Sequence, residues 1–427
     1  MGELNVQIEI NGTMVPVGII RGENPSEACF SYLPEYMDRA GARPISISLP
    51  FQAEAFSTAR TRNFFDGMLP EGFTRRSVAQ WVRADEDDYI ALLASLGKEC
   101  LGAVQITEKD GGADAPQYRK LAMEEIRALA AEGATRSAEI LKKTHLSLTG
   151  ATGKVGLYFR ESENAWYYPS GTAPSTHIVK QSHVRLKNIV LNEQLCLRTA
   201  ALLGLPVPES FIIDAGGGED KDVLFATRRY DREFGEHSCD VDGLPVPMRL
   251  HQEDFAQAMG IHAFDKYEKP GENYLFRMFS VLRDYSSDPI ADQMKLWDIV
   301  VFDYLIGNTD NHIKNCSLLY GPDLRQKRLA PAYDILSTAV YPESTRNMAY
   351  HIGDADSLDR ITRNSFEIAA EELHLGKKNA MKHFDGLADR LEKALREAAG
   401  ELSDHGFVHA GRLRDAILRK GGISRLG

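Results

Sequence analysis

The chain has 427 residues, of which 43% are hydrophobic and 26% charged, a composition typical of a globular protein with two or three domains. Its formal net charge of −11 argues against a protein that coats nucleic acid over its whole surface, although it leaves a local basic patch open. The five cysteines are scattered and form no CxxC pair, which predicts reduced thiols and no structural zinc site. They are Cys29, Cys100, Cys196, Cys239 and Cys316.

The N-terminus begins with an alternating, strand-like pattern and not with a basic segment followed by an apolar one, so the sequence predicts no signal peptide. The most apolar stretch, 299–306, is too short to cross a bilayer and contains Asp303. We therefore expect a cytoplasmic protein without a membrane partner.

Residues 1–107 are predicted to form a small α+β domain. Asn11-Gly12 separates two alternating runs and is typical of a hairpin turn. The predicted strands are 4–10, 14–20, 45–49 and 103–106, and the predicted helices are 74–83 and 86–96. The polar, Gly-rich segment 109–116 reads as a linker.

Residues 108–248 show the order of elements found in a kinase-like nucleotide-binding lobe. Helices are predicted at 122–131, 136–142 and 191–203, the last ending at Gly204, and strands at 155–160, 166–168, 177–180, 210–214 and 222–227. Residues 249–427 are predicted to be helical. The stretch 294–306 has an apolar face at helical spacing, and further helices fit 365–374, 377–398 and 410–419. The residues of that face are Trp297, Val300, Val301, Tyr304 and Leu305.

The loop after this apolar helix contains the most informative polar residues of the chain. Asp310 is followed five residues later by Asn315, and Asp334 lies nineteen residues beyond Asn315. Kinase-type phosphoryl transfer needs a carboxylate that orients the acceptor hydroxyl, and an amide and a carboxylate that hold Mg²⁺ on the phosphates. The pattern predicts Asp310 as the catalytic group and Asn315 and Asp334 as metal ligands. The simpler alternative is a turn rich in Asn and Asp that binds nothing.

Neighbours of these three residues are assigned to the same nucleotide site. His312 is either a phosphate contact or a structural hydrogen-bond donor, and both readings stay open. Lys314 and Tyr333 stand directly before the two predicted metal ligands and are counted as nucleotide contacts.

Lys180 ends a short apolar strand, and Glu193 follows thirteen residues later on the next predicted helix. Kinase folds hold the α- and β-phosphates with a strand lysine that pairs with a helical glutamate. An ordinary exposed lysine and glutamate are the alternative, but their position before the Asp310 loop favours the kinase interpretation.

The segment 147–154 is a loop of small residues before a strand, so its backbone N–H groups can approach phosphates closely. It is not a Walker A motif, because only two residues separate its glycines and a valine follows its lysine. A glycine hairpin is the alternative. The predicted nucleotide contacts in this loop are Thr149, Gly150, Ala151, Thr152, Gly153 and Lys154.

A basic cluster, Lys377, Lys378 and Lys382, lies near a predicted helix start. A solvated helix face explains such a cluster, and contact with a DNA backbone is the sharper alternative.

Taken together, these motifs resemble the HipA-type serine/threonine kinases, the toxin half of bacterial HipBA toxin–antitoxin modules. The resemblance covers nearly the whole chain in the family's order. It is carried by Phe64 to Gly72 and Leu101 to Ile106, the loop 147–154, Pro169 to Lys180, Asn192-Glu193, Arg249 to Asp254, Gly307 to Asn315 and Leu329 to Asp334. It implies an α+β, two-lobed protein-kinase-like fold, with a mixed α/β N-terminal lobe and an all-helical C-terminal lobe.

The resemblance implies ATP and Mg²⁺ as cofactors and Ser147 as an autophosphorylation site. A phosphate there would repel the phosphates of ATP, which fits the family's use of that modification as an off state. Family targets include aminoacyl-tRNA synthetases, and the usual partner is a helix-turn-helix antitoxin, HipB, bound to operator DNA. The basic cluster falls where the family contacts DNA. Growth inhibition or persistence is the implied outcome.

The sequence departs from the family pattern at three positions. Thr152 stands where the family has Gln, and Gly153 replaces a common Glu or Pro, so the loop is expected either to be more flexible or to hold ATP differently. Arg228 and Tyr230 fall in the segment that resembles the nucleotide hinge, but a relative has an acid at the position of Arg228. Backbone groups read adenine at such hinges, so we expect nucleotide binding to survive.

Two other functions stay open at this point. A small-molecule or lipid kinase of related fold would use the same residues on a different acceptor. A weakly active kinase would act mainly as a DNA-bound co-repressor with a HipB-like antitoxin.

Overall fold

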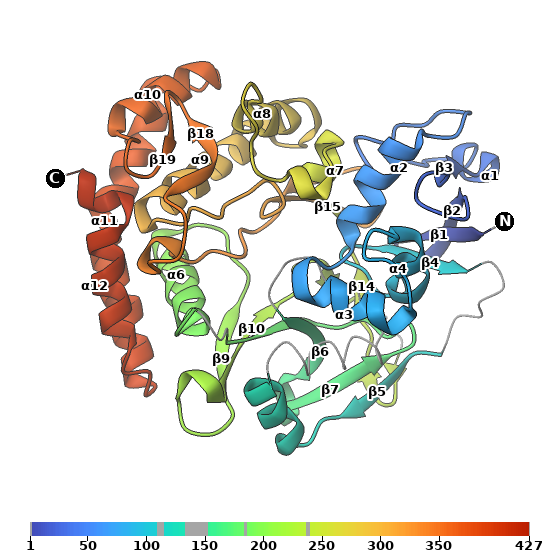
Figure 1. Cartoon of the computed structure of the whole chain (residues 1–427), viewed down its shortest axis with the longest axis horizontal. Helices are drawn as coiled ribbons and strands as arrows, with labels where there is room; N and C mark the ends of the chain where they lie inside the picture. The colour runs from blue at the N-terminus through green and yellow to red at the C-terminus, as the bar shows by residue number, and fades with distance from the viewer. Residues whose placement is uncertain (1, 109–114, 133–152, 183–185, 236–239, 427) are drawn as a thin grey trace. The chain divides into compact units, whose positions relative to one another are not determined.

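The computed structural model describes residues 2–108, 115–132, 153–182, 186–235 and 240–426 (Figure 1). The chain forms two compact units, each assembled from several segments. Unit 1 contains residues 1–181, 226–263 and 318–327, and unit 2 contains residues 182–225, 264–317 and 328–427. Among the described residues, no helix is both long and apolar enough to cross a membrane.

The first sheet of unit 1 has the strand order β3-β2-β1-β4. Its strands are β1 (Glu3–Ile10), β2 (Thr13–Arg21), β3 (Cys29–Tyr32) and β4 (Val104–Glu108). Ile10 pairs with Thr13, so Asn11 and Gly12 form a two-residue turn, with φ values of 49° and 76°. Asn and Gly tolerate this left-handed region, which is the reason that Asn-Gly favours a hairpin. The predicted hairpin is confirmed.

Four short helices accompany this sheet: α1 (Pro34–Met37), α2 (Thr58–Phe65), α3 (Gly72–Val82) and α4 (Tyr89–Leu96). The helices predicted at 74–83 and 86–96 correspond to α3 and α4. The strand predicted at 45–49 is wrong, because that segment forms turns. Its polar groups are bound by a side chain instead of a neighbouring strand: Ser46 Oγ donates to Glu253 Oε2 at 2.5 Å and the Ile47 N–H to Glu253 Oε1 at 3.1 Å.

The second sheet of unit 1 has the order β5-β7-β6-β8-β10. Its strands are β5 (Gln117–Lys120), β6 (Lys154–Arg160), β7 (Ala165–Ser170), β8 (His177–Gln181) and β10 (Val223–Arg228), and a helix at 123–132 follows β5. Val155 and Val179, which are register partners on β6 and β8, are fully buried. The smaller elements are β11 (Arg232–Glu233), β12 (Asp240–Val241), β13 (Leu244–Pro245), β14 (Met248–Arg249), β15 (Gln252–Asp254) and α7 (Phe255–Met259).

Unit 2 is built mainly from helices (Figure 1). They are α6 (Ile189–Leu203), α8 (Tyr274–Tyr285), α9 (Pro289–Ile306), α10 (Arg363–Glu372), α11 (Lys377–Asp404) and α12 (Ala410–Lys420). All five residues of the predicted apolar face of α9 are fully buried. The long helix α11 packs against α6, α9, α10 and α12 and so forms the centre of this bundle.

The C-terminal region is not all-helical as predicted. It also contains β16 (Ser317–Tyr320), β17 (Lys327–Leu329), β18 (Asn347–Ile352) and β19 (Ala355–Ser357). Residues 318–327 belong to unit 1, whereas β18, β19 and β9 (Ser210–Asp214) belong to unit 2. In the β18–β19 hairpin Ile352 pairs with Ala355, which leaves Gly353 in the turn at a φ of 57°. β17 and β19 have only three residues each, too few for hydrophobic periodicity to reveal, whereas β9 was predicted at 210–214.

Candidate functional site

The helix α9 delivers the Asp310 loop, and Gly307 ends that helix as predicted. Gly307 has a φ of 75°, and its N–H donates to the Tyr304 carbonyl at 3.0 Å. Glycine is needed at this position for a second reason. A Cβ atom here would lie 2.7 Å from the Cβ of Ala339 and 3.0 Å from the Cα of Gly421. The chain therefore turns sharply at one defined residue before the polar loop begins.

The loop is fixed on one side by residues 338 and 339. The Thr309 N–H donates to Thr338 Oγ1 at 2.7 Å, and the Ala339 N–H donates to the Gly307 carbonyl at 2.9 Å. The second bond satisfies a carbonyl group at the helix end, where carbonyls lack intrahelical partners. They also attach the start of the Asp310 loop to the chain that follows Asp334.

The buried carboxyl group of Asp303 supports the loop. Burial raises the pKa of Asp303 to about 7, although hydrogen bonds from Asn308 and Asn311 oppose the shift. Asn308 Nδ2 donates to Asp303 Oδ1 at 2.9 Å, and Asn308 Oδ1 accepts from the Asp310 N–H at 3.2 Å. Asp303 thus orients the Asn308 amide, and that amide orients the backbone of Asp310.

Asp310 presents an exposed carboxylate on a well-anchored backbone. Its carbonyl accepts from Asn315 Nδ2 at 2.9 Å and from the His312 N–H at 2.8 Å. Its Oδ1 accepts a hydrogen bond from the Tyr267 hydroxyl at 2.6 Å. The His312 ring is buried, and its centroid lies 5.4 Å from that of Tyr267, edge to face. The loop therefore fixes the peptide groups and leaves the carboxylate at the surface.

The segment around Asp334 lies beside residues 314–317. The Tyr333 hydroxyl donates to the Lys314 carbonyl at 2.9 Å and lies 2.7 Å from Ser317 Oγ. Asn315 and Asp334 therefore each stand next to one end of the Tyr333–Lys314 bond, and their role as metal ligands stays a prediction. On the far side, Asn192 of α6 and Ser337 exchange two hydrogen bonds, of 2.9 and 3.1 Å.

Asp334 adopts the left-handed conformation, with a φ of 58°. This region is unfavourable for residues with a Cβ atom, although Asp and Asn tolerate it best, and such strain is concentrated at functional sites. The donor set suits Mg²⁺, which prefers carboxylate and amide oxygens. Because Asn315 Nδ2 is already used by the Asp310 carbonyl, the Oδ1 of that amide is the atom suited to a cation. No group of three or more His, Cys, Asp or Glu ligands occurs among the described residues.

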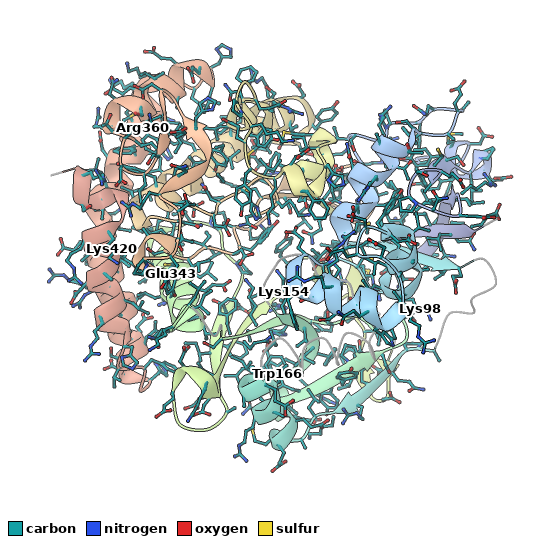
Figure 2. The ribbon with its side chains drawn as sticks, in the orientation of Figure 1. Lys98, Lys154, Trp166, Glu343, Arg360 and Lys420 are labelled. Carbon is teal, nitrogen blue, oxygen red and sulfur yellow. The ribbon has the colours of Figure 1, made fainter. Side chains whose placement is uncertain are left out.

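Lys154 and Lys180 are register partners on the antiparallel strands β6 and β8 of unit 1. Directly opposed residues of two strands lie on the same face of the sheet, and like charges there are unfavourable unless an anion or acid compensates them. Lys180 is 8% exposed, and Figure 2 labels Lys154 at the start of β6. The predicted phosphate lysines therefore come together in one place.

The remaining predicted contacts are divided among several places. Gly153 is buried directly before β6, whereas Ser147, Thr149, Gly150, Ala151 and Thr152 lie outside the described residues. Glu193 is buried on α6 of unit 2. Arg228 ends β10 with an exposed side chain, and the Tyr230 hydroxyl donates to Gln252 Oε1.

Sequence reasoning missed a buried charge cluster in unit 1, which we name the Glu99 cluster. Arg229 and Arg232 donate to Glu99 Oε1 at 3.2 and 2.7 Å, and Arg249 donates to Glu99 Oε2 at 2.9 and 2.7 Å. All members are at most 8% exposed. The cluster consists of Glu9, Glu99, Arg229, Asp231, Arg232 and Arg249.

The Glu99 cluster fixes the segment that resembles a nucleotide hinge. The Arg229 N–H donates to the Thr176 carbonyl at 2.9 Å, directly before β8, and Asp231 Oδ2 accepts from the Gly102 N–H at 2.7 Å. The only signal in the sequence was the density of charge in 228–232, which by itself does not distinguish a buried cluster from a solvated loop.

The basic cluster Lys377, Lys378 and Lys382 lies along α11 in a groove that also contains acids. Lys377 Nζ lies 3.1 Å from Glu367 Oε2 and 2.9 Å from Glu371 Oε1. These carboxylates reduce the positive potential that the sequence alone suggested, and DNA contact by this cluster stays a prediction.

Family models match most of the chain. The "HipA N-terminal domain" matches residues 8–107, and the "HipA-like C-terminal domain" matches residues 146–395. The chain belongs to the HipA family. It is 32% identical to Y4mE of Sinorhizobium fredii, whose name describes it as a kinase, over 96% of both chains. It is 25% identical to the serine/threonine-protein kinase toxin HipA of Shewanella oneidensis, over 83% of this chain and 80% of that one.

The fold agrees with this membership. The solved complex of HipA, HipB and operator DNA from Shewanella oneidensis MR-1 contains a chain that superposes with a TM-score of 0.79 at 20% sequence identity. The match covers 99% of this chain and 97% of the other. The predicted α+β fold of HipA type is confirmed, and relatives named as kinases support a HipA-like kinase role.

Proposed function

We propose that this protein is an ATP-dependent serine/threonine kinase that acts as the toxin of a toxin–antitoxin module. The observation that carries the proposal is the anchored loop of unit 2. Asp310 offers an exposed carboxylate on a fixed backbone, and the Tyr333–Lys314 hydrogen bond joins the two segments that contain Asn315 and Asp334. This is the residue set that phosphoryl transfer requires.

In the proposed mechanism the protein binds the nucleotide, orients the acceptor hydroxyl and neutralises the charge of the phosphates. Bound Mg-ATP supplies the phosphoryl group and the cation that spreads its charge. Asn315 and Asp334 hold Mg²⁺, and Lys154 and Lys180 bind nucleotide phosphates. Asp310 accepts a hydrogen bond from the acceptor serine or threonine and takes up its proton. The nucleotide contacts proposed for Glu193, Arg228, Tyr230, His312, Lys314 and Tyr333 have a supporting role.

Transfer of ³²P from [γ-³²P]ATP to the protein itself and to a bacterial protein extract tests this proposal. We expect Asp310→Asn to lower the transfer rate at least about 100-fold, because it removes the group that accepts the proton. Asp284→Asn is the matched control, since it makes the same change at an exposed residue of α8. An Asp310→Asn variant as active as Asp284→Asn would refute the assignment. Transfer to a metabolite and not to protein would favour the small-molecule kinase.

Ser147 is proposed as the autophosphorylation site that turns the kinase off. Intact-mass measurement of protein incubated with Mg-ATP should show an added phosphate, and Ser147→Ala should lose it. An active wild-type enzyme whose Ser147 stays unmodified would contradict this regulation.

A HipB-like helix-turn-helix antitoxin is the proposed partner and would bring the kinase to operator DNA. The support is the Shewanella complex, in which HipA is found with HipB and operator DNA. The helix-turn-helix product of an adjoining reading frame should co-purify with this chain and form a ternary complex with DNA upstream of the two genes. Its failure to bind the chain would remove the partner and leave the kinase assignment intact.

Aminoacyl-tRNA synthetases are the first protein substrates to test.

A further inference from the structure

Tyr267 makes a contact that the proposed mechanism does not use. Its side chain is 46% exposed, yet its hydroxyl donates to Asp310 Oδ1 at 2.6 Å. In kinase chemistry an acceptor hydroxyl donates its proton to this same carboxylate. A serine of a protein substrate and the Tyr267 hydroxyl would therefore donate to the same Asp310 carboxylate.

The backbone of the Asp310 loop is held without Tyr267. Asn308 accepts from the Asp310 N–H, and Asn315 donates to the Asp310 carbonyl. Thr309 is bound to Thr338. Since these bonds fix the peptide groups without Tyr267, the phenol hydroxyl affects the Asp310 carboxylate and not the backbone conformation of the loop.

Tyr267 is held in place by its neighbour, Glu268. The Glu268 N–H donates to the Ala349 carbonyl of β18 at 2.8 Å, and Glu268 Oε2 accepts from the Tyr274 N–H at the start of α8 at 2.7 Å. Glu268 Oε1 also accepts a hydrogen bond from the His351 ring, and this bond raises the pKa of His351. The backbone that carries Tyr267 is thus fixed to two elements of unit 2.

The side chain beyond this anchor is half-exposed. Its ring contacts the buried His312 ring edge to face, and Lys266 Nζ lies 5.5 Å from its centroid. A half-exposed phenol loses little apolar burial when it turns into solvent. A fixed backbone, a half-exposed side chain and a hydrogen bond to the proposed catalytic carboxylate together describe a displaceable cover.

We infer that the Tyr267 hydroxyl occupies the place of the acceptor hydroxyl on Asp310 and competes with protein substrates until one displaces it. This inference rests on the proposed kinase function. It makes Tyr267 a positioning residue that lowers the affinity for weakly bound acceptors and so favours substrates with additional contacts. The free energy of one exposed hydrogen bond to a charged group is enough to raise the KM of a competing acceptor about 2- to 10-fold.

Kinetics with dephosphorylated casein as the acceptor provide the first test. We expect Tyr267→Phe to lower the KM for casein about 2- to 10-fold while kcat stays unchanged, because the competitor is removed and the reacting groups are kept. Tyr285→Phe is the matched control, since Tyr285 lies on α8 and is 48% exposed. A lower kcat in Tyr267→Phe, or kinetics equal to those of Tyr285→Phe, would overturn the inference.

A second test does not depend on kinase activity. N-acetylimidazole acetylates exposed tyrosine hydroxyls, and mass spectrometry of peptides compares Tyr267 with Tyr285 in the full-length protein. We expect Tyr267 to react about threefold more slowly than Tyr285 in the wild type, because its hydroxyl is engaged, and at a similar rate in Asp310→Ala. Equal rates in the wild type would refute the contact. A protected Tyr267 in a protein that transfers no phosphate would instead locate the failure in the proposed function.

Discussion

Replacing Glu99 by glutamine tests how far the Glu99 cluster stabilises unit 1. The substitution keeps the shape of the side chain but removes its charge and turns one acceptor oxygen into a donor that faces a guanidinium group. Glu99 accepts four hydrogen bonds from three arginines, at 2.7 to 3.2 Å, and its side chain is 2% exposed. Breaking a buried ion pair of this kind costs about 3–5 kcal/mol, because the partner charges stay buried without compensation.

The pKa of Glu99 also indicates that loss of its charge destabilises the folded state. Burial raises this pKa, but the charges of Arg232, Arg249 and Arg229 outweigh burial and hold it below its usual value of 4.5. The ionised carboxylate therefore stabilises the folded state above pH 4.5, and this contribution is lost as the pH falls through the lower pKa of the folded state. The difference between the wild type and Glu99→Gln should be full at pH 7 and smaller in strong acid.

Thermal unfolding at pH 7 measures the effect. For a unit of this size, the loss corresponds to a decrease in Tm of roughly 6 to 20 °C. Glu125→Gln is the matched control, because Glu125 also binds an arginine, Arg119, through two hydrogen bonds, of 2.9 and 3.0 Å, but at the surface. That pair should be worth at most about 1 kcal/mol. If Glu99→Gln costs no more than Glu125→Gln, the cluster does not stabilise the fold as argued.

Three further predictions follow from single residues. Burial raises the pKa of Glu253 to about 7, so the folded state keeps a proton that the unfolded state loses above pH 4.5. The free energy of unfolding should therefore fall by up to about 3 kcal/mol from pH 4.5 to 7, a decline that urea titrations should find absent in Glu253→Gln. Gly307→Ala forces a Cβ atom to within 2.7 Å of the Ala339 Cβ at a positive φ. It should lower the free energy of unfolding by about 1–3 kcal/mol and slow phosphoryl transfer. A variant with wild-type rate and stability would argue against a rigid turn. Lys180→Met should weaken the binding of a fluorescent ATP analogue at least about tenfold, whereas Lys120→Met on β5 should not, because its side chain is 61% exposed and remote from β8 in the sheet order.

Elements with a strong local pattern were predictable from the sequence. The apolar face of α9 and its end at Gly307 follow from helical spacing and from the conformational freedom of glycine, and both are confirmed. The segment 45–49 has the composition of a strand, but Glu253, 207 residues away from Ser46, takes up its polar groups. A partner that distant leaves no trace in local periodicity.

The residues of the candidate site were predictable from the sequence. The spacing of Asp310, Asn315 and Asp334 predicts their chemistry, and hydrogen bonds from Asn315 to Asp310 and from Tyr333 to Lys314 join the segments that contain them. The contacts that other parts of the chain make with these residues were not predictable. The contact between Tyr267 and Asp310 joins residues 43 positions apart, and Glu99 meets Arg249 across 150 positions. Such contacts depend on how separate elements pack, since hydrogen bonds and ion pairs form wherever folding places a donor beside an acceptor.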